Sequence, residues 1–333
     1  MYAALRSRHA KRIFTFSLLC PLLACGASED AADSPDSDAS VDTGDASDDS
    51  AALAPLAYMP CATGARVGDF GVQLASDFTA VQGWIRSGVV PAEVPEEVAS
   101  EGGCQLMRAR SLFCDPGCNP GETCGEGGVC IPYPTNLTVG VVNVEGLSAE
   151  VALEPRAPIN LYANSGTLPH PGFETGADIR MRAEGGDQAA FSLRGQGVEA
   201  LVTSEVGQVA GGQPLPVSWE ATTQTDAARI QLRLDLDNHG ASLGWITCVA
   251  EDTGSFEVPA SLIDGLLALG VSGFPSISMS RRTTESAMLD AGCVEFSVFS
   301  EAELSLEVEG VISCGEDADC ASNNCRGDLT CGE

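Results

Sequence analysis

Apolar and polar side chains alternate along much of this chain, and the alternation predicts β-strands. In residues 229–236, four aliphatic side chains alternate with four polar ones. Residues 302–309 repeat the pattern, with Leu304, Leu306 and Val308 separated by serine and glutamate. Successive side chains of a strand point to opposite faces of its sheet. We therefore expect strands with one buried face and one face toward solvent.

Eight shorter runs alternate in the same way between turns rich in glycine, aspartate and asparagine. They are residues 137–144, 149–153, 178–183, 189–193, 217–221, 245–249, 276–281 and 294–299. Ten short strands, each with a polar face, predict a mainly β fold: an antiparallel β-sandwich of immunoglobulin-like or jelly-roll type over residues 134–312. A helix is expected at residues 261–269, beginning at Ser261 and ending at Gly270.

Residues 58–133 combine short strands with closely spaced cysteines, which predicts a small β and cysteine-rich module of its own. Strands are expected at residues 69–74, 79–85 and 105–113, although the second of these also fits one side of a short helix. The segment CDPGCNPGETCGEGGVC follows, and it has almost no apolar residues for a core. Disulfides must therefore hold it. The segment resembles EGF-like and other small knotted modules, and residues 313–333 form a second cysteine-rich module.

The first 24 residues have the features of an export signal. Four basic residues and no acid precede an apolar run at residues 13–23, which is too short to cross a bilayer. Leu22-Leu23-Ala24-Cys25 follows, and it resembles the lipobox of bacterial lipoproteins, in which the cysteine is linked to diacylglycerol and becomes the new N-terminus. The resemblance implies a signal peptide at 1–24 and a membrane anchor on Cys25. A plain secretory signal, with Cys25 incidental, is the alternative.

Residues 25–57 predict the lipid anchor followed by a disordered acidic linker. Residues 26–50 contain nine acids, no base and no aromatic side chain. Such a segment buries too little apolar surface to offset the entropy lost on ordering. We interpret it as a solvated spacer rather than a calcium-binding segment.

Twelve cysteines remain after Cys20, in the signal, and Cys25 are set aside, and an even number in an exported chain predicts complete disulfide pairing. They are Cys61, Cys104, Cys114, Cys118, Cys124, Cys130, Cys248, Cys293, Cys314, Cys320, Cys325 and Cys331. Their spacing contains no CxxC and no histidine lies nearby, so we expect no metal. The pairs that we favour are Cys61–Cys104, Cys114–Cys124, Cys118–Cys130, Cys248–Cys293, Cys314–Cys325 and Cys320–Cys331, although spacing alone cannot decide between the possible pairings.

The charge of the chain excludes one class of partner. The formal net charge is −30, and loss of the signal leaves 13 arginines and no lysine against 47 acids. A surface that neutralises phosphates needs clusters of lysine and arginine. We therefore expect no binding to nucleic acid.

The chain offers little catalytic chemistry. It contains no HExxH, no G-x-S-x-G and no phosphate-binding loop, so no cofactor is expected. Trp84, Trp219 and Trp245 are candidates for a carbohydrate platform. We expect a protein that is not an enzyme; the alternative is an anchored extracytoplasmic hydrolase that acts on glycan or peptide through a pair of its many carboxylates.

As a whole, the lipobox, acidic linker, cysteine-rich modules and strand-rich centre resemble the surface lipoproteins of high-GC Gram-negative bacteria. The resemblance implies a protein of the cell envelope, at the outer membrane because Gly26 rather than aspartate follows the anchor. It implies a non-catalytic binding, adhesion or structural role. The expected partners are the membrane, through Cys25, and an unknown protein or glycan ligand.

Overall fold

The computed structural model describes residues 55–204, 206–222, 227–236 and 242–332. The signal peptide, Cys25, nearly all of the linker and the turn around His239 therefore lie outside the described residues. The described part is mainly β, as predicted. In these ranges, no helix has both the length and the apolar character needed to cross a membrane.

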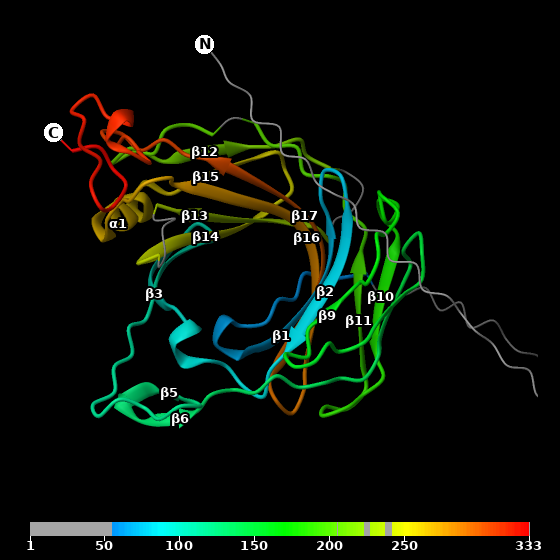
Figure 1. The fold of residues 1–333 in the computed structure, drawn as a ribbon. Helices are drawn as coiled ribbons and strands as arrows, with labels where there is room; N and C mark the ends of the chain where they lie inside the picture. Colours follow the sequence, from blue (N-terminus) through cyan, green and yellow to red (C-terminus); the bar gives the residue numbers. More distant parts are fainter. Residues whose placement is uncertain (1–54, 205, 223–226, 237–241, 333) are drawn as a thin grey trace, which may run out of the picture. The chain divides into compact units, whose positions relative to one another are not determined.

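A nine-stranded sheet is the largest element (Figure 1). Its strands, in spatial order, are β3 (Glu96–Glu101), β4 (Cys104–Arg108), β14 (Gly244–Glu251), β13 (Arg229–Asp235), β16 (Ser276–Met288), β17 (Cys293–Ser305), β1 (Arg66–Leu74), β2 (Thr79–Ile85) and β9 (Tyr162–Ala163). Neighbouring strands are antiparallel except β1 and β17, which are parallel. The prediction of antiparallel pairing is therefore wrong for this one pair: β1 pairs with its sequence neighbour β2 on one side, and on the other side it runs parallel to β17, the last of the described strands.

Three smaller sheets and one helix complete the described fold. The four-stranded sheet has the order β11 (Phe191–Gln196), β10 (Asp178–Ala183), β7 (Val142–Glu145) and β8 (Val151–Leu153). Two-stranded sheets pair β12 (Leu215–Ser218) with β15 (Ser255–Val258), and β5 (Glu122–Cys124) with β6 (Cys130–Pro132). Helix α1 (Ala260–Leu269) ends at Gly270 as predicted, but it begins after Pro259, and the Ser261 hydroxyl bonds to Glu101 instead of capping the helix.

Two hydrophobic cores lie on the same face of the nine-stranded sheet. On β17, Val294, Phe296 and Val298 belong to a core shared with the four-stranded sheet. Further along β17, Ala302 and Leu304 have the same parity and belong to a core shared with α1, β12 and β15. The long strands β16 and β17 therefore carry both cores, and the opposite face of the sheet is left without a covering sheet.

The predicted strands are largely present, but two strands that were predicted as separate form one continuous strand. Residues 294–299 and 302–309 belong mostly to one strand, β17, because the alternation continues through Ser300, a buried serine whose hydroxyl accepts a hydrogen bond from the Leu201 amide. Residues 79–85 form strand β2, which decides against the helical alternative. The boundary at 133/134 does not separate two sheets, because β1, β2 and β4 pair with strands that follow it.

Four of the six expected disulfides are confirmed, and two are wrong. Cys114–Cys124, Cys118–Cys130, Cys314–Cys325 and Cys320–Cys331 are present. The other four cysteines pair as Cys61–Cys293 and Cys104–Cys248, in place of Cys61–Cys104 and Cys248–Cys293. The sheet order explains the exchange, because Cys104 lies directly opposite Cys248 in the β4–β14 ladder, and Arg66, five residues after Cys61, lies opposite Cys293.

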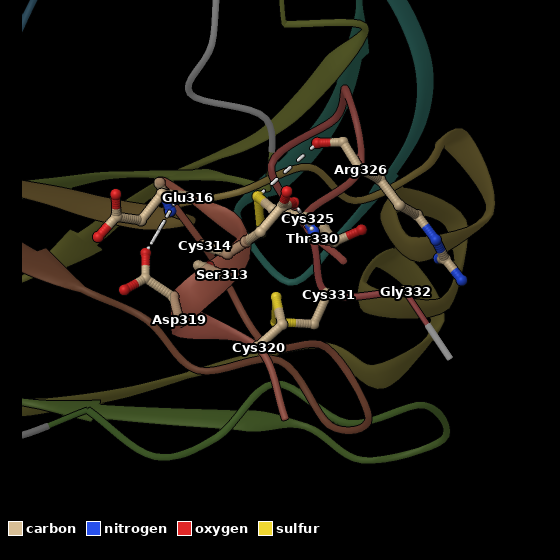
Figure 2. The surroundings of a disulfide bond; sticks show 12 residues. Ser313, Cys314, Glu316, Asp319, Cys320, Cys325, Arg326, Thr330, Cys331 and Gly332 are labelled. Atoms are coloured by element: carbon tan, nitrogen blue, oxygen red, sulfur yellow. Dashed lines mark hydrogen bonds between the residues drawn. A yellow bond between two sulfur atoms is a disulfide. The ribbon is translucent and has the colours of Figure 1, made fainter. Parts of the chain in front are cut away.

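Polar contacts reinforce the disulfides of the C-terminal module. At the start of the 3₁₀ turn Asp317–Asp319, the Asp319 carboxylate accepts a hydrogen bond from the Glu316 amide at 3.0 Å (Figure 2). The Asp317 carboxylate accepts a hydrogen bond from the Cys325 amide at 2.8 Å. Backbone amides of this small module thus find their hydrogen-bond acceptors in nearby carboxylates.

Candidate functional site

The candidate site is the face of the nine-stranded sheet that points away from both cores, which we call the polar face. Its side chains alternate with the buried ones along every long strand. They include Trp84 on β2, Phe299 on β17, Arg282 on β16, Gln231 and Arg233 on β13, and Trp245 and Thr247 on β14. Most of them are partly exposed.

Aromatic rings on the polar face are each stacked with an arginine. The guanidinium carbon of Arg233 lies 4.1 Å from the centre of the Trp245 ring. Arg86 and Trp84 are related in the same way at 4.8 Å, and Arg282 and Phe299 at 5.2 Å. Stacking of this kind fixes both planar groups and leaves guanidinium edges available for hydrogen bonds.

The three tryptophans do not form one carbohydrate platform. Through the strand registers, Trp84 lies level with Glu295 of β17, and Trp245 lies level with Ser305. Ten residues along a strand correspond to roughly 33 Å, so these rings occupy opposite ends of the polar face. Trp219 is buried in a core, where its indole nitrogen donates to Asp252 at 2.7 Å.

Arg282 is the least satisfied polar side chain of this face. Its Nε is buried and has no hydrogen-bond acceptor, and within the described ranges no carboxylate forms an ion pair with it. It lies directly opposite Arg229 of β13 and opposite Phe299 of β17. Phe299 in turn lies over Gly71, where a Cβ atom would approach the ring to 3.0 Å. A buried donor without an acceptor costs about 1–3 kcal/mol. The residue as a whole is partly exposed, and the rest of its guanidinium makes no hydrogen bond to the described residues, so a ligand oxygen would be favoured there.

A cluster of charged groups lies beside Arg282, where the segment before β1 joins the sheet. Glu295 is buried, and its two carboxylate oxygens accept from the Cys61 amide at 2.6 Å and from Arg66 at 3.3 Å. Asp69 is directly opposite Glu295 in the β1–β17 pair and lies 3.5 Å from Arg66. The Met59 amide donates to Thr284 of β16, which holds this segment against the sheet.

Two pKa values in this cluster are shifted upward. Burial raises the pKa of Asp69, Arg66 opposes the shift, and the neighbouring Glu295 charge adds to it. Burial also raises the pKa of Tyr58, while Arg282 opposes that shift. Asp69 and Glu295 are thus neighbouring carboxyl groups, and both oxygens of Glu295 are engaged in hydrogen bonds.

The cysteine clusters are engaged in disulfides. The sulfurs of Cys114, Cys118 and Cys124 lie close together, as do those of Cys314, Cys320 and Cys325. Each of these sulfurs is bonded to another sulfur. A metal is held by thiolates, so neither cluster can act as a metal site in this oxidised form.

Sequence reasoning singled out Trp84 and Trp245 but missed Arg282, Asp69 and Glu295. The alternation in β16 places Arg282 on the polar face, which is a signal that the sequence carries. Its proximity to Phe299 and Arg229 depends on which strands are neighbours, and that order is not visible in a single strand.

Comparison with known proteins assigns no family. No protein-family model matches the sequence, and no curated protein matches it. A solved structure with some similarity is that of the chicken CNTN1 FN1–FN3 domains, at 10% identity and a TM-score of 0.21, covering 69% of this chain and 78% of that chain. A TM-score of this size does not establish a shared fold.

Proposed function

We propose that this protein is anchored in the bacterial outer membrane through a lipid on Cys25 and binds a neutral glycan on the polar face, without catalysing a reaction. The lipobox and the acidic linker support the anchor. The disulfide-tied sheet supports a binding role, because it presents a fixed surface at the end of a spacer.

The observation that carries the glycan proposal is Arg282, a stacked and partly exposed arginine near the middle of the polar face, whose guanidinium makes no hydrogen bond to the described residues. Glutamine, threonine and serine side chains surround it, and the Trp–Arg stacks lie at both ends. Planar polar groups and aromatic rings together suit sugars, which have hydroxyl groups on their edges and apolar faces. A neutral glycan is favoured over an acidic one because the chain is strongly negative.

Equilibrium binding of the full-length mature protein in detergent tests the proposal. The probes are a glucose hexamer and an N-acetylglucosamine hexamer, each titrated into the wild type, Arg282→Gln and Arg108→Gln. Arg108 is an exposed arginine paired with Glu96 away from the polar face, so its variant removes the same charge. We expect one of the hexamers to bind the wild type and Arg108→Gln equally and to bind Arg282→Gln about tenfold more weakly. Equal binding to all three would contradict the proposed site, as would a failure of every neutral glycan to bind.

The second candidate function is hydrolysis of a glycan by Asp69 and Glu295. Its support is the raised pKa of Asp69 beside a second carboxylate. Release of reducing ends from the same hexamers measures it directly. Turnover that Asp69→Asn abolishes would establish the enzyme and overturn the binding proposal.

A further inference from the structure

A cavity on the outer surface of the four-stranded sheet is separate from the polar face and collects three of the arginines. Its volume is about 440 Å³, and it is lined by Arg180 and Arg182 of β10 and by Phe191, Ser192 and Arg194 of β11. Arg180 lies directly opposite Arg194, and Arg182 opposite Ser192. Cavities of a few hundred Å³ are the size that small ligands use.

The acids near the cavity orient the guanidinium groups of Arg180 and Arg182 without using up their donors. Asp178 accepts from the Nε of Arg180 at 2.7 Å and from the Nε of Arg194 at 3.1 Å. Glu145 lies 3.7 Å from the Nε of Arg182. In the part of the chain that the structure describes, the Nη groups of Arg180 and Arg182 donate no hydrogen bond to another residue. The acids thus hold both guanidinium groups through Nε, and the Nη groups remain available as hydrogen-bond donors.

The charge balance at the cavity is opposite to that of the whole chain. Three guanidinium groups face two carboxylates here, in a chain of formal net charge −30. Arginine forks bind oxyanions through two or more oxygens, and a tetrahedral group offers three oxygens where a carboxylate offers two. Phe191 supplies an apolar wall for the rest of the ligand.

We propose that this cavity binds a single phosphate or sulfate ester group on a small, otherwise neutral organic molecule. The ester oxygens accept from the Nη groups of Arg180 and Arg182, the charge of Arg194 adds to the attraction, and the organic part contacts Phe191. A polyanion is disfavoured, because the acidic surface beyond the cavity repels additional negative charge.

Calorimetric titration of the full-length mature protein tests the site with phenyl phosphate, phenyl sulfate and benzoate. We expect saturable binding of phenyl phosphate or phenyl sulfate, and the tighter of the two identifies the ester that the site recognises. Benzoate should bind at least about tenfold more weakly than that ester. The Arg180→Gln/Arg182→Gln variant should lose about tenfold or more in affinity, because charge-assisted hydrogen bonds are removed. Binding should weaken as salt is raised.

Two controls make the result decisive. Arg108→Gln and Arg282→Gln should bind phenyl phosphate and phenyl sulfate as the wild type does, so failure of the polar-face proposal would leave this one standing. Arg182→Gln alone guards against misfolding of the double variant, because more than half of the Arg182 side chain is exposed. Absence of saturable binding, equal affinity for benzoate, or unchanged affinity in Arg182→Gln and the double variant would overturn the proposal.

Discussion

Arg281 and Arg282 are adjacent in β16 and occupy opposite faces of the nine-stranded sheet, and their surroundings differ completely. Arg281 is 1% exposed and donates from all three of its nitrogens. Its Nε lies 2.6 Å from Asp252, its Nη1 donates to the Ala200 carbonyl at 3.1 Å, and its Nη2 donates to the Glu220 carbonyl. Arg282 stacks on Phe299, has no carboxylate partner in the described ranges, and keeps a buried Nε without an acceptor.

This difference separates an arginine that holds the fold together from one that is available to a ligand. The Asp252 carboxylate also accepts from the Trp219 indole, so Arg281 belongs to a network that joins β16 to three separate segments, at residues 199–200, 220 and 252. Removing one partner from such a buried network leaves an uncompensated charge. Arg282 has no comparable network, and its loss should affect binding rather than folding.

The largest expected effect is on stability, from removal of Arg281. Arg281→Met should lower the free energy of unfolding by about 3–5 kcal/mol, because Asp252 and three carbonyl groups lose their buried donor. Arg282→Met should change it by less than about 1 kcal/mol in either direction, because no ion pair is lost and an unsatisfied buried donor is removed. Urea unfolding followed by circular dichroism measures both. Equal losses in the two variants would remove the distinction between the faces.

The next effect concerns the Cys104–Cys248 disulfide, which joins β4 to β14 inside the core shared with α1. Replacing Cys104 and Cys248 by alanine should lower the stability by about 2–5 kcal/mol, since this bridge joins residues 144 apart in sequence. Peptide mapping of the unreduced protein should first recover the Cys104–Cys248 and Cys61–Cys293 pairs. Recovery of Cys61–Cys104 instead would contradict the strand order itself.

The smallest effect concerns Asp69 and depends on pH. Its raised pKa means that the folded state binds the proton more tightly than the unfolded state, so ionisation of Asp69 lowers stability as pH rises through that pKa. Asp69→Asn removes this cost and should raise the melting temperature at pH 7 relative to the wild type. The gain should disappear as pH falls below the unfolded-state pKa of an aspartate, about 3.9. Melting curves from pH 3 to pH 8 test this, and a gain that grows toward low pH would refute it.

The positions of single strands were predictable from the sequence, but which strands pair with one another in the sheet was not. Ile230, Leu232 and Leu234 alternate with polar residues, and this alone identifies both the strand β13 and its buried face. The parallel pairing of β1 with β17 joins segments more than 200 residues apart, and no pattern within either strand specifies it. The two disulfide pairs were predicted wrongly for the same reason. Which of their four cysteines lie close together depends on the order of strands that are far apart in sequence.

The same limit applies to the candidate site. The alternation in residues 79–85 puts Val81 and Ile85 on the buried face of the strand. Trp84 therefore lies on its other face, which is the polar face. Parity in residues 276–281 likewise places Arg281 among core residues, which makes sense only once Asp252 is known to be its partner. Asp252 directly follows β14, and only the folded arrangement of the strands brings it to Arg281.

Acrylamide quenching of tryptophan fluorescence, with and without the bound glycan hexamer, tests the central claim most directly: that the polar face is the surface covered by ligand. Variants Trp84→Phe and Trp245→Phe each keep one polar-face tryptophan together with the buried Trp219, and the double variant keeps Trp219 alone. We predict that the hexamer protects at least one of the single variants from quenching and leaves the double variant unchanged. Binding that alters quenching of the double variant just as strongly would contradict the account, and so would binding that protects neither polar-face tryptophan.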